Sequence, residues 1–122
     1  MSEKTVLIIE DNEQNLYLMR FLLEKNGFRV ADASDGPNGI QAACALQPDL
    51  ILLDIQLPGM DGYAVARKLR EAGVLASTPI IAVTSYAMVG DRERALEAGC
   101  TGYIEKPIDV DKFLDQVALF LA

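Results

Sequence analysis

Several polar side chains of this sequence each follow closely on a short apolar segment of strand-like composition. They are Glu10, Asp11, Asp54, Thr84 and Lys106. If these segments are parallel strands of one sheet, their carboxyl ends meet at one edge, where the ligand sites of open α/β sheets lie. Three acids, a hydroxyl and an ammonium would then converge, although they are distant in the sequence.

Three carboxylates and one lysine leave a local excess of negative charge. A hard divalent cation would relieve it, and Mg²⁺ (or Mn²⁺) favours this pattern of carboxylates, waters and substrate phosphate. Thr84 could then donate a hydrogen bond to one phosphoryl oxygen, and Lys106 could pair with another. The remaining carboxylate would be a competent nucleophile. Asp54 is the best candidate, because Glu10 and Asp11 already suffice as metal ligands.

Each of these residues also has a simpler interpretation. Asp11 could cap a helix, Asp54 could cap a turn, and Thr84 and Lys106 could be a routine strand end and a surface lysine. A carboxylate that follows the aliphatic run 50–53 would, however, be partly desolvated, which costs energy unless it is paired. The joint occurrence of the set, rather than any single member, favours the functional interpretation.

The composition excludes several functions. The chain has 122 residues and no histidine, so it cannot form a Ser-His-Asp or Cys-His nucleophile system, an imidazole zinc site or a phosphohistidine. Its 18 acidic and 11 basic residues give a net charge of −7, which argues against a nucleic-acid partner. The apolar runs are far shorter than the roughly 20 residues of a membrane helix, and no signal-peptide core precedes Glu10. We expect a cytoplasmic domain in which Cys44 and Cys100 are unpaired.

Apolar strand-like runs alternate with helical patterns along the whole sequence. Strands are expected at 5–9, 29–33, 50–53, 80–83 and 102–104. Helices are expected from about 12 to 26, from Asp35 to about 46, over a segment with Val65 and Leu69 that ends near 72, from about 90 to 98, and after a cap at Asp109. This alternation predicts an α/β fold with an open, mostly parallel sheet and helices on both sides. We expect one domain over 1–122 with no output domain.

The sequence resembles the receiver (phospho-acceptor) domain of two-component response regulators over its whole length. The motifs that carry the resemblance are Glu10-Asp11-Asn12, the segment from Asp54 to Gly62, Thr84-Ser85, Tyr103 and Lys106-Pro107. The resemblance implies a flavodoxin-like, doubly wound (βα)₅ fold with strand order 2-1-3-4-5.

By the same resemblance, Asp54 is the phosphorylated residue and Glu10 and Asp11 are the metal acids, with the Gln56 backbone carbonyl as a further ligand. Thr84 and Lys106 contact the phosphoryl group, Thr84 and Tyr103 form the conformational switch, and the Lys106-Pro107 peptide bond is cis.

The resemblance also implies the partners. The phosphoryl group would come from a phosphohistidine on a sensor histidine kinase or a histidine phosphotransfer protein. The signal would reach a downstream protein through the surface made by the fourth helix, the fifth strand and the fifth helix. We expect a monomer or a weak phosphorylation-dependent dimer. The motifs are closest in style to single-domain and hybrid-kinase receivers, and the sequence leaves both open.

Three residues depart from the commonest pattern of the family. Glu10 stands where aspartate is usual, and its extra methylene could alter the metal geometry. Ser85 replaces an alanine but is still small enough to allow phosphate access. Tyr86 is bulky, and we expect it to shield the acyl phosphate from water and to slow its hydrolysis.

Other functions compete with this interpretation. An aspartate-nucleophile phosphatase would carry a second aspartate where this chain has Gln56, which cannot donate a catalytic proton. A flavin or nucleotide module would need a phosphate-binding loop, and neither G-x-G-x-x-G nor G-x-x-x-x-G-K-[ST] occurs. A constitutive protein-interaction module on the same fold would be a degenerate receiver, yet all the key side chains are present.

Overall fold

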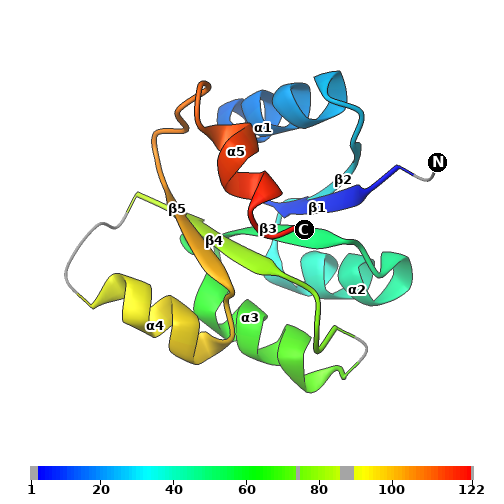
Figure 1. Ribbon diagram of the computed structural model, residues 1–122. Coiled ribbons are helices and arrows are strands. Elements are labelled where there is room, and N and C mark those ends of the chain that lie inside the picture. The colour runs from blue at the N-terminus through cyan, green and yellow to red at the C-terminus, as the bar shows by residue number, and fades with distance from the viewer. Residues whose placement is uncertain (1–2, 74, 86–89, 122) are drawn as a thin grey trace.

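A five-stranded parallel sheet forms the centre of the molecule (Figure 1). The computed structural model describes residues 3–73, 75–85 and 90–121. The strands are β1 (Thr5–Ile9), β2 (Arg29–Ala33), β3 (Leu50–Asp54), β4 (Ile80–Thr84) and β5 (Gly102–Glu105). The helices are α1 (Glu13–Lys25), α2 (Gly36–Leu46), α3 (Gly62–Glu71), α4 (Asp91–Ala98) and α5 (Phe113–Ala118). The strand order β2-β1-β3-β4-β5 confirms the predicted flavodoxin-like α/β fold.

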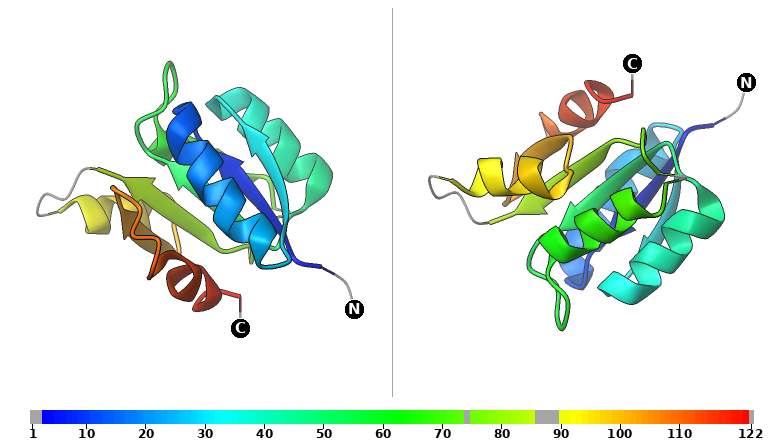
Figure 2. Two further views of the ribbon diagram at one scale, coloured as in Figure 1. Left: turned by 90° about the horizontal axis from the view of Figure 1, so that it is seen from above. Right: turned by 90° about the horizontal axis from the view of Figure 1, so that it is seen from below.

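Helices cover both faces of the sheet (Figure 2). Because successive strand residues point to opposite faces, the central strands of a sheet covered on both sides are buried on both faces, as β1, β3 and β4 are along most of their length. One face packs against α1 and α5 through the buried residues Met19, Leu23, Phe113 and Val117. The other face packs against α2, α3 and α4 through Ala43, Tyr63, Val65, Ala66, Leu69, Ala95 and Ala98. The second layer is therefore built largely from small side chains.

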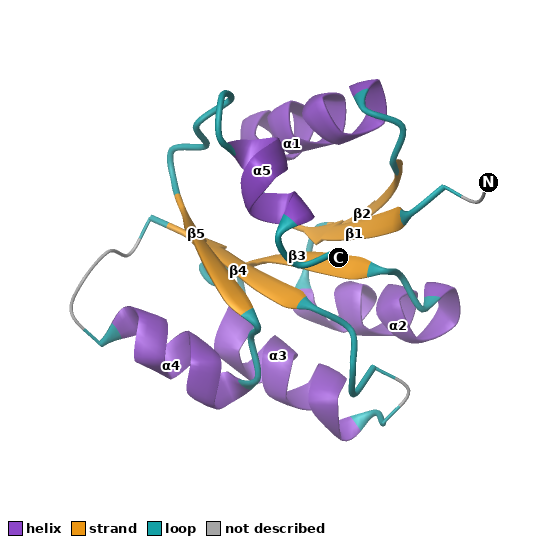
Figure 3. Cartoon of the chain, in the orientation of Figure 1, coloured by secondary structure: helices purple, strands orange, loops and turns teal. Residues whose placement is uncertain are grey.

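Short polar side chains cap α1, α2 and α3. The backbone course of these helices can be followed in Figure 3. Asn12 caps α1 by accepting a hydrogen bond from the Asn15 N–H at 2.9 Å. Asp35 caps α2 and Asp61 caps α3 in the same way. A cap is worth about 1 kcal/mol, because it satisfies a backbone donor that the first helical turn leaves unpaired. The predicted cap at Asp35 is confirmed.

The predicted cap of the last helix is wrong. Helix α5 begins at Phe113, and its first residue has no side-chain cap. The carboxylate of Asp109 instead accepts a hydrogen bond from the Asp111 N–H at 2.9 Å, which closes a turn before the helix. A short side chain that bonds to the backbone two residues ahead stabilises a turn as readily as a helix, so composition alone could not separate the two.

Gly62 allows α3 to pack closely on the end of β3. A Cβ atom at this position would lie 2.5 Å from the Ile55 Cα and 2.6 Å from the Asp54 carbonyl oxygen. The Gly62 N–H donates to the Ile55 carbonyl at 2.9 Å. The start of α3 is thereby held against the segment that presents Asp54.

Cys44 and Cys100 are unpaired, as predicted. Burial raises the pKa of the Cys100 thiol to about 11, so this thiol stays protonated and unreactive at neutral pH. Among the described residues, none of the helices combines the length and the apolar character that crossing a bilayer requires.

Candidate functional site

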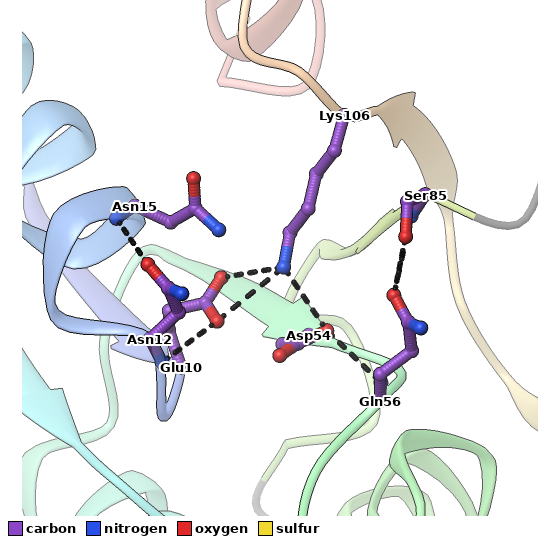
Figure 4. A network of polar contacts seen from close by, with 7 residues as sticks. All are labelled: Glu10, Asn12, Asn15, Asp54, Gln56, Ser85 and Lys106. Carbon is purple, nitrogen blue, oxygen red and sulfur yellow. Dashed lines mark hydrogen bonds and ion pairs between the residues drawn. The ribbon is translucent and has the colours of Figure 1, made fainter.

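The parallel register brings the ends of four strands to one edge of the sheet. Ile9 pairs with Leu53 and Asp54 pairs with Val83, so Glu10 and Asp54 leave neighbouring strands side by side. Thr84 pairs with Glu105, which directly precedes Lys106 on the next strand. Residues that are far apart in the sequence therefore meet here (Figure 4).

Lys106 lies between two buried acids. Its Nζ atom is 3.0 Å from Oε1 of Glu10 and 3.3 Å from Oδ1 of Asp54. The Glu10 and Asp54 side chains are 1% and 2% exposed, whereas the lysine side chain is 11% exposed. One ammonium thus faces two carboxylates that have little water to solvate them, and negative charge remains in excess.

Burial and the neighbouring Asp54 together favour the protonated form of Glu10. Its pKa is raised from 4.5 to about 7, first by burial and then by a hydrogen bond with Asp54 and the charge of that residue, against the opposing effect of Lys106. Among the buried side-chain atoms of the described residues, Oε1 of Glu10 lacks a hydrogen-bond partner in spite of its proximity to the ammonium. A buried carboxylate oxygen in this condition is well placed to accept a cation.

The third acid completes a set of hard oxygen donors. One carboxylate oxygen from each of Glu10, Asp11 and Asp54 lies within 4.8 Å of the others. Asp11 is exposed, so the group opens to solvent on one side. Because Mg²⁺ prefers carboxylates together with waters, this donor set fits a magnesium ion. The metal role of the Gln56 backbone carbonyl stays a prediction.

The simpler interpretations of two acids have different outcomes. Helix α1 is capped by Asn12, so the capping interpretation of Asp11 is wrong. Asp54 does accept a hydrogen bond from the Gln56 N–H, at 2.9 Å, and therefore both stabilises a turn and faces Lys106. The turn thus orients one oxygen of Asp54 toward the ammonium.

The two predicted switch residues, Thr84 and Tyr103, differ in burial. Thr84 is fully buried at the end of β4, and Tyr103 on β5 is partly buried against the core on the α3 and α4 side. Burial also raises the pKa of the Tyr103 hydroxyl above its usual value. The Lys106-Pro107 bond is cis, as predicted. Tyr86, with its predicted shielding role, lies outside the described residues.

An open cleft of about 780 Å³ surrounds the acids. Its described lining comprises Glu10, Asp11, Asn12, Glu13, Gln14, Asn15, Asp54, Gln56, Ser85, Lys106 and Pro107. Thr84 is not among these lining residues, and the neighbouring Ser85 lines the cleft instead.

The sequence assigned no role to the start of α1 or to the side chain of Gln56. The position of Asn12 directly after the acids was the available signal for the helix start.

Comparison with known proteins shows the family. Residues 6–118 match the response regulator receiver domain, and the chain belongs to this family. The polar-differentiation response regulator DivK of Brucella anthropi is 42% identical over 118 residues, which cover 97% of this chain and 96% of that protein. DivK of Brucella abortus has the same identity and coverage. The resemblance noted from the motifs is confirmed.

Solved structures agree with this assignment. The receiver domain of a sensor histidine kinase from Pseudomonas aeruginosa PAO1, which holds a magnesium ion in its active-site cleft, is 32% identical with a TM-score of 0.90 and covers 98% of both chains. A CheY-like receiver from Methanospirillum hungatei is 29% identical with a TM-score of 0.91, covering 98% of this chain and 94% of that one. The chain is therefore a receiver domain of two-component signalling.

Proposed function

We propose that Asp54 accepts a phosphoryl group from a phosphohistidine on a sensor histidine kinase or a histidine phosphotransfer protein. One observation carries the proposal: Lys106 lies within ion-pair distance of both Glu10 and Asp54, which are buried beside Asp11. The arrangement places a nucleophile, a cation and a set of metal-binding oxygens in one open cleft. The donor histidine must belong to the partner, because this chain contains none.

The residues of this chain divide the chemistry among them. Glu10, Asp11 and Asp54, with the Gln56 carbonyl, would hold Mg²⁺ or Mn²⁺, and the bound ion would neutralise the charge of the incoming phosphoryl group. A carboxylate oxygen of Asp54 attacks phosphorus and forms a P–O bond while the P–N bond to the donor imidazole breaks. The imidazole nitrogen keeps the electron pair of that bond. Lys106 pairs with one phosphoryl oxygen, and Thr84 donates a hydrogen bond to another.

The output follows as a shift between two packings. A hydrogen bond from Thr84 to the phosphoryl group draws its hydroxyl toward Asp54, and Tyr103 turns inward to fill the space that the hydroxyl leaves. The surface formed by α4, β5 and α5 then changes for a downstream protein. The burial of Thr84 and the partial burial of Tyr103 on the adjacent strand support this coupling.

Three further elements belong to the same proposal: a cytoplasmic location, action without direct nucleic-acid contact, and a monomer or weak phosphorylation-dependent dimer. The net charge of −7 supports the second element, because nucleic-acid binders present a basic face.

The proposal is tested by intact-mass measurement after incubation with Mg²⁺ and acetyl phosphate, or with a phosphorylated histidine kinase. The parent protein should gain one phosphoryl group, whereas Asp54→Asn should gain none. Asp115→Asn, an exposed acid on α5, is the matched control and should label like the parent. Equal labelling of Asp54→Asn, or a parent that stays unlabelled, contradicts the proposal. Sustained turnover of a small phosphate ester would instead indicate a phosphatase.

A further inference from the structure

Gln56 contacts the site twice, once with its backbone and once with its side chain. Its N–H donates to Oδ1 of Asp54 at 2.9 Å. Its side-chain oxygen Oε1 accepts a hydrogen bond from the Ser85 hydroxyl at 2.6 Å and a longer one from the Ser85 N–H at 3.4 Å. The side-chain contact connects the segment after β3 to the end of β4, beside Asp54 (Figure 4).

Both partners of this contact line the cleft that holds Asp54. Ser85 therefore has two donors, the hydroxyl and the backbone N–H, that converge on one neutral oxygen at the edge of the phosphoryl site. A phosphoryl group on Asp54 would bring several anionic oxygens into the same cleft. Such oxygens accept hydrogen bonds more strongly than a carboxamide does.

We propose that the Gln56 carboxamide occupies the Ser85 donors in the unphosphorylated protein and that the phosphoryl group must displace it. Gln56 is then a positioning residue that slows phosphorylation, because a hydrogen bond has to break before Ser85 can face the new anion. This inference rests on the proposed function of Asp54. Since one hydrogen bond is worth a net factor of roughly five, its loss should raise the rate of phosphorylation about fivefold.

The Gln56 side chain can move to a second pocket when the phosphoryl group displaces it from Ser85. Gln56 also borders a second pocket, of about 390 Å³, on the side of α4. Its described lining is Ile55, Gln56, Leu57, Asp61, Tyr63 and Arg94. The Arg94 guanidinium lies 4.6 Å from the centre of the Tyr63 ring, so the pocket offers cationic and polar groups to a carboxamide. The Gln56 side chain therefore still has polar neighbours after its displacement from Ser85.

Three substitutions of Gln56 separate acceptor strength from shape. Gln56→Met keeps the length of the side chain but removes the hydrogen-bond acceptor. Gln56→Glu keeps the shape of the side chain but makes the acceptor stronger. All keep the backbone N–H and carbonyl. The rate of phosphorylation by acetyl phosphate at saturating Mg²⁺ should be highest for Gln56→Met, intermediate for the parent and lowest for Gln56→Glu. The rate of Gln56→Met should be about fivefold above that of the parent. Gln56→Ala should resemble Met. Gln41→Met, an exposed substitution on α2, is the matched control and should leave the rate unchanged.

Ser85→Ala supplies the second arm of the test. It removes the hydroxyl that makes the shorter contact, so Gln56→Met should gain much less in the Ser85→Ala background than in the parent. A role of Gln56 that is merely steric would leave the effect of Gln56→Met on the rate unchanged by Ser85→Ala. That result overturns the inference.

The failure of this inference is distinguishable from that of the proposed function. If the parent gains a phosphoryl group on Asp54 and Gln56→Met gains it no faster, only the role of Gln56 is wrong. If the parent gains none under any donor, the proposed function fails and the inference fails with it.

Discussion

The two edges of the sheet each hold a partly buried cation, but the two cations have very different partners. At the carboxyl edge, Lys106 faces the acids Glu10 and Asp54. At the opposite edge, Arg70 at the end of α3 donates to neutral oxygens of the segments that enter β4 and β5. Its acceptors are the carbonyls of Leu75 at 2.7 Å, Thr78 at 2.6 Å and Gly99 at 2.9 Å, and the Thr101 hydroxyl at 3.2 Å.

The difference separates a structural site from a functional one. The planar guanidinium of Arg70 distributes its donors over acceptors from two segments, so it holds the entries of β4 and β5 together. The carboxyl edge is incomplete, because Glu10 carries a raised pKa and an oxygen without a hydrogen-bond partner. A site that must receive a charged group cannot be fully satisfied in its absence. We therefore expect substitutions at the two edges to respond differently to Mg²⁺.

The largest effect is expected for Lys106→Met in the absence of metal. It leaves two buried carboxylates without their shared cation, and we expect a loss of about 4 kcal/mol in the free energy of unfolding at pH 8. Mg²⁺ should restore much of this loss, because the ion supplies positive charge at the same place. Urea unfolding with and without Mg²⁺ measures both quantities. Lys112→Met, an exposed lysine, is the control, and equal midpoints for the two variants would contradict the prediction.

A second prediction concerns the pH dependence of stability. Because the pKa of Glu10 is raised to about 7, the folded protein binds a proton at this residue more tightly than the unfolded chain does. The contribution of Glu10 to the free energy of unfolding therefore falls as pH rises from about 4.5 through about 7, by roughly 3 kcal/mol in total.

Glu10→Gln removes this contribution, so the parent should lose about 3 kcal/mol more than the variant between pH 4.5 and 7.5 in metal-free buffer. Urea unfolding at several pH values measures the difference. Glu13→Gln, an exposed acid in the first turn of α1, should retain the slope of the parent. A Glu10→Gln variant with the same slope as the parent would show that Glu10 has an ordinary pKa.

At the opposite edge, Arg70→Met should cost about 2 kcal/mol, because several hydrogen bonds to two segments are lost while water can reach part of the exposed oxygens. Arg70→Lys should recover only a fraction of the stability, since an ammonium lacks the planar fork. Chemical denaturation should give the same loss with and without Mg²⁺. A loss that Mg²⁺ reverses would remove the distinction between the two edges.

The smallest effect is expected at the cap of α1. Asn12→Ala should cost about 1 kcal/mol, because the Asn15 N–H loses its side-chain acceptor. Asn12→Ser keeps a capping oxygen and should remain near the parent in thermal unfolding. Equal melting temperatures for the alanine and serine variants would indicate that the cap contributes little here.

The sequence predicted the fold well, for a physical reason. The run 50–53 of β3 is apolar throughout because both faces of the sheet are covered, and this continuous pattern differs clearly from the helical spacing of Leu16, Met19 and Leu23. The start of the last helix, α5, was predicted less well. Asp109 carries the residue type of a helix cap but closes a turn, and the choice depends on where Phe113 can enter the core.

The sequence by itself determined which chemistry is available: three acids, a hydroxyl and a lysine, each at the end of an apolar segment, with no histidine in the chain. The spacing of these residues along the chain does not determine which of them pair with one another. Only the tertiary structure placed Lys106 between Glu10 and Asp54, buried Thr84 while Ser85 faces the cleft, and joined Ser85 to Gln56. These features depend on strand register and on burial, because register sets the distances between residues remote in sequence and burial sets the strength of their interactions.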